Sequence, residues 1–148
     1  MNVEEVIKTD KKIPLETRTI IHLMLVNNKI NEIVASALKP FEVSVQQFNV
    51  LRILRGRKGE PANLSTLNER MVNKMSNTTR LVDKLLLKGY VNRFVCESNR
   101  RKVEISITDK GKEALSQMDV TMRVAENAIV NKFDKKELEQ LNILLNKF

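Results

Sequence analysis

The stretch from Asn63 to Lys112 reads NLSTLNERMVNKMSNTTRLVDKLLLKGYVNRFVCESNRRKVEISITDKGK, and it decides the fold. Its patterns predict two short helices, a glycine stop at Gly89 and then a charged β-hairpin. A helix-turn-helix followed by a hairpin wing places one helix in the major groove of DNA. We therefore expect a winged helix-turn-helix fold of mainly α (α+β) class, with a small antiparallel β-wing.

The second of these short helices has one apolar and one polar face. Asn63 is expected to cap the first helix and Ser76 the second, which runs from Asn77 to about Lys88. The residues expected in the core are Thr78, Leu81, Val82 and Leu85. Those left pointing outwards are Asn77, Thr79, Arg80, Asp83 and Lys84. Small hydrogen-bonding groups at the N-terminal end and longer cations further along are typical of a recognition helix.

The hairpin is predicted from two strands, Val91–Cys96 and Lys102–Thr108, joined by the loop from Glu97 to Arg101. The loop puts Arg100 and Arg101 next to each other at the tip. Arginines at such a tip can enter a narrow minor groove. The alternative is that they are edge-strand charges that discourage aggregation.

A long helix is predicted on the N-terminal side of this stretch. Pro14 lies just inside its start, Pro40 ends it, and the helix is about 24 residues long. Its apolar residues recur at spacings of three, four and seven: Ile20, Leu23, Met24, Ile30, Ile33, Val34, Ala37 and Leu38. Residues 1–12 show no apolar period and are expected to form a loose tail.

A capping box then starts the next helix, with Ser44 as the cap and Gln47 as its partner, and Gly56 stops it. Four cations gather near the end of this helix: Arg52, Arg55, Arg57 and Lys58. They either lie near a phosphate backbone or are favourably placed at a helix C-terminus.

Two further helices are predicted after the hairpin. Thr108 caps a long one that runs through Ile129, and Asp134 with Glu137 caps the last. One apolar stripe continues to the last residue: Leu138, Leu141, Leu145 and Phe148. Because such a stripe is unlikely to face water, the first and the last two helices are expected to be dimerisation surfaces.

The bulk composition favours a soluble intracellular protein. The 148 residues fit one domain with helical extensions, and 42% of them are hydrophobic, enough for a core. The longest apolar run, Ile20 to Val26, is far too short to span a bilayer. The first residues include acids before any apolar region, unlike a secretory signal. The single cysteine suits a reducing cytoplasm, so we expect a cytoplasmic protein without membrane association.

The net charge of +8 is concentrated in the middle of the chain. Residues 70–112 carry +7, whereas residues 1–69 carry +2 and residues 113–148 carry −1. A local basic surface attracts nucleic acid by displacing counterions from phosphates. The alternative is a solvated face that keeps the protein soluble.

No pattern in the sequence indicates catalysis or a cofactor. There is no paired-carboxylate site, no nucleophile–base arrangement and no phosphate-binding glycine loop, so we expect no enzyme and no catalytic residues. With one histidine, His22, and one cysteine, Cys96, no metal-ligand cluster exists. We interpret His22 as a core or interface residue and Cys96 as a small apolar strand residue.

Several motifs together resemble the MarR (multiple antibiotic resistance regulator) family of bacterial transcription factors. They are S44-x-x-Q47-F48-x-V50-L51, E69-R70-M71, S76-N77-T78-T79-R80-L81-V82-D83-K84-L85, K88-G89-Y90-V91-x-R93, N99-R100-R101-x-V103 and T108-x-x-G111. The resemblance spans nearly the whole chain. It implies a homodimer paired through its terminal helices that binds a palindromic operator in double-stranded DNA. It also implies a repressor that a small-molecule ligand releases, with a pocket where the long first helix, the second helix and the fifth helix meet near the DNA-binding lobe.

The resemblance also assigns residues to the interface. The residues implied to face the major groove are Ser76, Asn77, Thr79, Arg80 and Lys84. Arg100 and Arg101 are implied to be the wing-tip arginines. The chain departs from the family at Asn99, where an aspartate usually steadies the wing. Because an amide carries no charge to pair with Arg93 or Arg101, we predict a more mobile wing tip.

These observations divide the chain into an N-terminal dimerisation helix (1–40), a winged helix-turn-helix lobe (41–112) and C-terminal dimerisation helices (113–148) of one intertwined domain. The leading hypothesis is a sequence-specific DNA-binding transcriptional regulator. The alternative is a ligand-sensing or protein-docking winged helix without sequence-specific DNA recognition. The basic excess on residues 70–112 argues against the alternative, because docking alone needs no such charge.

Overall fold

The structure is a computed structural model that describes residues 1–74, 76–96 and 99–148, with the side chains of residues 96 and 99–102 left out of the description. The elements are, in order, α1 (Val3–Val6), α2 (Leu15–Leu38), the 3₁₀ turn η1 (Lys39–Phe41), α3 (Val45–Gly56), α4 (Leu64–Arg70), α5 (Thr78–Leu87), β1 (Val91–Cys96), β2 (Asn99–Ile107), α6 (Asp109–Val130) and α7 (Lys135–Leu145). This is the predicted winged helix-turn-helix with long flanking helices.

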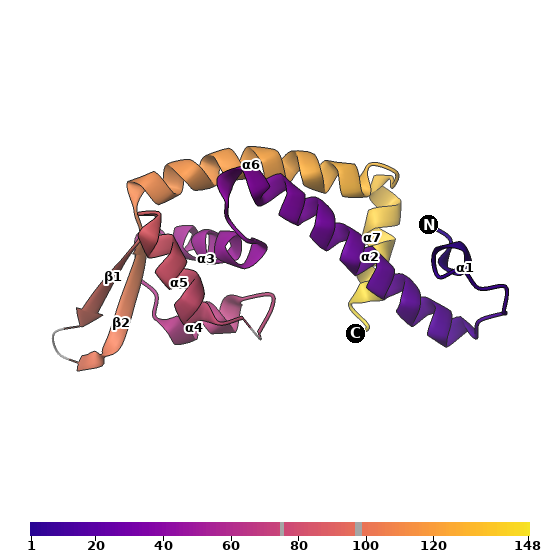
Figure 1. The fold of residues 1–148 in the computed structure, drawn as a ribbon, viewed down its shortest axis with the longest axis horizontal. Helices are drawn as coiled ribbons and strands as arrows, with labels where there is room; N and C mark the ends of the chain where they lie inside the picture. Colours follow the sequence, from indigo (N-terminus) through magenta and orange to yellow (C-terminus); the bar gives the residue numbers. More distant parts are fainter. Residues whose placement is uncertain (75, 97–98) are drawn as a thin grey trace.

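The long helices α2 and α6 pack against each other and form the frame of the molecule. In Figure 1 the lobe that contains α3, α4, α5 and the hairpin lies at one end, and α1 lies at the other. No helix in the described part of the chain combines the length and apolar character that crossing a lipid bilayer requires.

The core lies where the lobe meets the frame. Its fully buried side chains come from almost every element: Leu38 of α2, Leu51 and Leu54 of α3, Leu67 of α4, Val82 and Leu85 of α5, Ile105 of β2, and Leu115 and Met118 of α6. Burial of each such side chain contributes about 1.5–3 kcal/mol. The face of α5 that the sequence placed inside is therefore the face that holds this helix in position.

The local capping signals produce the predicted helix starts. Ser44 and Gln47 form the complete capping box of α3, with the Gln47 amide N–H donating to Ser44 Oγ over 3.1 Å. Asp134 and Glu137 form the same arrangement at α7. Pro14 differs slightly from the prediction, because it is the N-cap residue of α2 and not its first helical residue.

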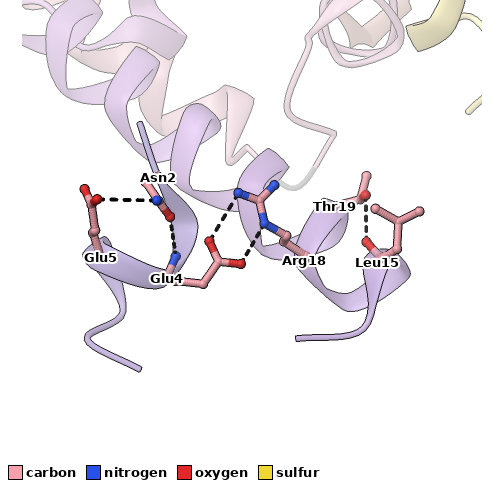
Figure 2. Close-up of polar contacts among 6 residues, drawn as sticks. All are labelled: Asn2, Glu4, Glu5, Leu15, Arg18 and Thr19. Atoms are coloured by element: carbon pink, nitrogen blue, oxygen red, sulfur yellow. Dashed lines mark hydrogen bonds and ion pairs between the residues drawn. The ribbon is translucent and has the colours of Figure 1, made fainter. Parts of the chain in front are cut away.

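The expected loose tail at residues 1–12 is wrong, because α1 is a short helix that packs on α2. Val3 is fully buried. Arg18 on α2 donates from Nε and Nη2 to the Glu4 carboxylate over 2.7 and 3.2 Å, as Figure 2 shows. The hydrogen bonds from Arg18 hold the pKa of Glu4 below its ordinary value of 4.5, and the same contact raises the pKa of Arg18.

The hairpin is an antiparallel pair in which Val91 faces Ile107 and Arg93 faces Ile105. Strand β2 begins at Asn99, three residues before the predicted Lys102, so the predicted five-residue loop is wrong. The reason is tertiary pairing, because Asn99 lies opposite Cys96 after a register shift. Residues 97 and 98, also assigned to that loop, lie outside the described residues.

Candidate nucleic-acid interface

The start of α5 is set by Asn77, which corrects the predicted cap at Ser76. The Asn77 side chain accepts from the Arg80 amide N–H over 3.1 Å, and Ser76 precedes the cap. Both residue types cap helices well, so local preference could not separate them. Because the Asn77 Oδ1 atom caps the helix, the side-chain amide N–H groups remain for an outside partner.

The rest of α5 presents the predicted division between faces. Thr78, Val82 and Leu85 are buried, and Leu81 is half-buried against the core. The exposed side chains of the helix include Thr79, Arg80, Asp83 and Lys84. Of the last two leucines, Leu86 packs against the core and Leu87 is 89% exposed.

A shallow hollow brings most of the predicted contact residues together. Its lining contains four of the five: Ser76, Asn77, Arg80 and Lys84. Thr79 is exposed on the same helix but does not line the hollow. Gln46 of α3 and Asn73 of the turn before α5 also line it, and neither was among the residues predicted from the sequence. Gln46 lies inside the capping motif of α3, which was interpreted only as a helix start.

Hydrogen bonds at both ends fix α5 within the lobe. At its start the Thr78 hydroxyl donates to Asn68 of α4. At its end Gly89 adopts a left-handed φ of +72°, and its N–H donates to the Leu86 carbonyl over 2.9 Å. The Thr108 hydroxyl then donates to the Gly89 carbonyl over 2.7 Å, which joins this end to the base of the wing.

The wing is attached to α5 by an ion pair between Arg93 of β1 and Asp83. Arg93 therefore has an acidic partner, although Asn99 lacks the charge to provide one. The backbone of Arg100 and Arg101 lies in β2. Their side chains, and that of Cys96, lie outside the description, so their predicted roles stay predictions.

Three of the four cations near the end of α3, namely Arg52, Arg55 and Arg57, have structural partners. Arg55 pairs with Asp119 of α6. Arg57 donates to the Pro61 carbonyl over 3.0 Å and pairs with Glu60 at 3.2 Å. The Arg52 guanidinium lies 5.7 Å from the centroid of the Phe48 ring. These contacts favour a role in holding the lobe together over one in binding phosphate.

Within residues 1–74, 76–96 and 99–148, wherever side chains are described, no three His, Cys, Asp or Glu residues gather as metal ligands would. The lobe has an exposed helix face with amides and cations. That helix packs on the core, and the hairpin lies beside it. That combination defines a winged helix-turn-helix domain.

Comparison with known proteins agrees with this class. The MarR family model matches residues 43–103. The HTH-type transcriptional regulator PecS of Dickeya dadantii (strain 3937) is 31% identical over 110 residues, which cover 72% of this chain and 65% of PecS. The chain thus spans slightly less than two thirds of that curated relative.

Solved structures share the fold over most of its length. A MarR-like transcription regulator from Bacillus cereus ATCC 10987 superimposes with a TM-score of 0.80 at 25% identity, covering 90% of this chain and 96% of that chain. A mutant of E. coli MarR complexed with operator DNA has a TM-score of 0.75 at 23% identity, covering 90% and 93%. The protein belongs to the MarR family.

Proposed function

We propose that the protein is a sequence-specific, DNA-binding transcriptional regulator that acts as a homodimer. The observation that carries the proposal is the outer face of α5, where Asn77, Arg80 and Lys84 line one hollow on a buried, hydrogen-bonded scaffold. Amide and guanidinium groups at the start of a helix are suited to base edges in a major groove. The net charge of +7 on residues 70–112 supplies the attraction to phosphates.

The dimer is supported by the apolar faces that the flanking helices leave exposed. On α2, Ile20 is 59% and Met24 62% exposed. After α7, Phe148 is 91% exposed, and Leu144 in the helix is 50% exposed. Apolar surface of this kind marks a protein interface, and a second copy of the chain is the commonest partner. A two-fold dimer presents two α5 helices about 34 Å apart, one turn of DNA.

The similarity to PecS supports a transcriptional regulator, and the fold shared with an operator-bound MarR is consistent with DNA as its partner. We propose a palindromic operator on the family resemblance, and a cytoplasmic location because the single cysteine suits a reducing compartment. We place this protein among repressors on the family resemblance, with release by a small-molecule effector. We propose the domain organisation on the same family resemblance. In it, residues 1–40 and 113–148 pair the subunits, and residues 41–112 bind DNA.

The second candidate is a protein-docking or ligand-sensing winged helix that does not recognise a DNA sequence. The observation that favours it is that several large apolar side chains are exposed on the lobe, because exposed apolar surface can mark a protein contact. Leu87 at the end of α5 is 89% exposed, and Phe94 and Val95 of β1 are 57% and 55% exposed. The net charge of +7 on residues 70–112 favours the first candidate, a DNA-binding regulator.

A binding experiment separates the two candidates. Labelled duplexes from the DNA that flanks the protein's own gene are titrated against the protein, with a shuffled duplex of equal composition as control. A regulator binds one duplex at least about 10³-fold more tightly than the shuffled control, and the affinity falls as salt rises. Equal affinities for both duplexes, or no salt dependence, would favour docking. Footprinting of the preferred duplex then shows whether the protected site is two-fold symmetric.

A further inference from the structure

The lobe that contains α5 is connected to the long helices at two places, the end of α2 and the start of α6 (Figure 1). At the first, the chain passes through the turn η1 and Glu42 before α3 begins. At the second, strand β2 of the wing leads into α6. The orientation of α5 relative to the long helices therefore depends on how firmly both connections are held.

Lys88, the C-cap residue of α5, contacts both connections. Its Nζ atom donates to the Phe41 carbonyl oxygen of η1 over 3.5 Å and lies 3.4 Å from Oε2 of Glu42. Its own carbonyl oxygen accepts from Nζ of Lys110, in the first turn of α6, over 2.9 Å. One residue thus joins the end of α5 to α2 and to α6.

The contact with η1 lies where the backbone needs support. Glu42 has a φ of +51°, in the left-handed region that residues other than glycine rarely adopt. A conformation of this kind persists only where the surrounding structure holds it. Lys88 contacts both residues at this point, Phe41 through the backbone and Glu42 through the carboxylate. In the described part of the chain, no side chain between Thr78 and Leu87 forms a hydrogen bond or ion pair with this turn.

We propose that Lys88 is a positioning residue that sets the orientation of α5 relative to α2 and α6, and thereby the spacing of the two half-sites that a dimer accepts. This inference rests on the proposed function, because only a DNA-binding dimer has two half-sites to space. Lys88 lies at the opposite end of α5 from Asn77 and Arg80, and its ammonium group contacts η1. It therefore acts through the orientation of the helix, without contacting a base.

The test measures affinities for three duplexes that share the same half-sites. Their centre-to-centre distance is the one found by footprinting, or differs from it by one base pair in either direction, which turns one half-site about 34° relative to the other. We expect the unchanged protein to prefer one spacing. Lys88→Met keeps the length of the side chain and removes the ammonium group, and should reduce this preference about threefold to fivefold, as expected for an exposed ion pair. No preference in the unchanged protein, or an equal one in Lys88→Met, overturns the proposal.

Two variants separate the contact from the charge. Lys112→Met is the matched control, because Lys112 pairs with Asp109 inside the first turn of α6 at 2.9 Å and joins no other element. It removes the same charge and should leave the spacing preference unchanged. Lys88→Arg keeps the charge and the donors, and should keep the preference. A preference in Lys88→Arg as weak as that in Lys88→Met contradicts the proposal.

Glu42→Gln tests the same contact from its other side. Glu42 is 85% exposed, so the variant should fold normally. Because it removes an anion, a purely electrostatic effect would raise the affinity equally at all three spacings, whereas a lost contact reduces the preference for one of them. The salt dependence of Lys88→Met gives a further check, because a lost phosphate contact flattens the salt slope by about one unit. A flatter slope than that of Lys112→Met would make Lys88 a phosphate contact and overturn the proposal.

Hydrogen exchange without DNA tests the contact independently of the operator. The Glu42 amide N–H donates to the Lys39 carbonyl over 3.0 Å. Its exchange should be about threefold to fivefold faster in Lys88→Met and unchanged in Lys112→Met. Equal rates in all three proteins overturn the proposal whether or not an operator is found. Equal binding of operator and shuffled duplexes by the unchanged protein refutes the proposed function and the effect on spacing with it, whereas a spacing preference that Lys88→Met leaves intact refutes only this inference.

Discussion

Asp83 on α5 and Arg93 on β1 form an ion pair that joins α5 to the first strand of the wing. The two side chains remain 51% and 33% exposed, so the pair contributes less than about 1 kcal/mol to stability. Its effect on geometry is larger, because it fixes the wing strand against the helix whose outer face is proposed to contact bases. It also holds Arg93 near a carboxylate instead of a phosphate.

Replacing Asp83 with alanine is therefore expected to change specificity more than stability. Freed Arg93 can contact a phosphate, so binding to random DNA should tighten and the salt slope should steepen by about one unit. The ratio of operator to random affinity should fall, because the wing is no longer held against α5. Salt titrations on both DNAs measure all three quantities. An unchanged ratio would show that the pair does not position the wing.

Variants of Arg80 and of the wing arginines are expected to affect DNA binding differently, because Arg80 is proposed to contact bases and the wing arginines to contact the DNA backbone. Arg80→Ala should weaken operator binding by about 1–3 kcal/mol and random binding much less, because a lost base contact matters only at the correct site. Arg100→Ala with Arg101→Ala should lower both affinities similarly and flatten the salt slope. Titration of the variants on operator and shuffled duplexes checks this. Equal losses on both duplexes for all variants would contradict the division of roles.

Two glycines, Gly89 after α5 and Gly111 in the first turn of α6, provide a stability test. A Cβ atom at Gly111 would lie 2.1 Å from the Tyr90 carbonyl oxygen, so Gly111→Ala forces the base of the wing away from α6. We expect a loss of more than about 2 kcal/mol in the free energy of unfolding. Gly89→Ala has space but keeps a φ of +72°, and should cost about 1–2 kcal/mol.

Gly56→Ala is the matched control for these two variants. Apart from its chain neighbours and the backbone of its own helix, no atom lies within 4 Å of its Cβ position, and the residue is helical. Its stability should stay the same or rise by up to about 1 kcal/mol. Urea unfolding of the three variants gives their free energies of unfolding, which can then be ranked. A smaller loss for Gly111→Ala than for Gly89→Ala would mean that the contact with Tyr90 relaxes easily.

Local signals in the sequence predicted the helices well, and pairings between distant segments explain the errors. The capping boxes at Ser44 and Asp134 need only residues within one turn, so the sequence was sufficient. The burial of Val3 depends on α2, which lies beyond any local pattern. The start of β2 at Asn99 depends on its pairing with Cys96.

The same reasoning applies to the candidate site. The exposed residues of α5 followed from helical periodicity, and the structure agrees. Gln46 was missed because it belongs to another helix, and only the packing of α3 beside α5 brings it to the hollow. The partners of Arg55 and Arg93 were missed for the same reason, since Asp119 lies on α6 and Asp83 on α5.

The contact between α1 and α2 is expected to depend on pH. The hydrogen bonds from Arg18 lower the pKa of Glu4, so the contact is complete above the ordinary value of 4.5 and is lost as pH falls through the lowered folded-state pKa. Amide hydrogen exchange at Val3–Val6 should therefore accelerate in acid relative to the intrinsic rate. Arg18→Gln should remove this dependence. The same acceleration in the variant would mean that another group releases α1.

The apolar surface of the terminal helices gives the last prediction. Leu144 of α7 is 50% exposed in the single chain, next to Leu145 at 43%. If a second copy covers this surface, Leu144→Glu buries a charge at the subunit interface, at a cost of several kcal/mol. Sedimentation should then show a monomer at concentrations where the unchanged protein is a dimer.

The control is the same substitution at Leu87, which is 89% exposed in the other lobe, away from the terminal helices. Leu87→Glu should leave the sedimentation unchanged. Operator binding by Leu144→Glu should become weaker, because a monomer presents one α5 helix to a two-part site and loses the gain from simultaneous binding. A Leu144→Glu protein that remains a dimer would place the subunit interface on another surface, with α2 and its exposed Ile20 and Met24 the next to test.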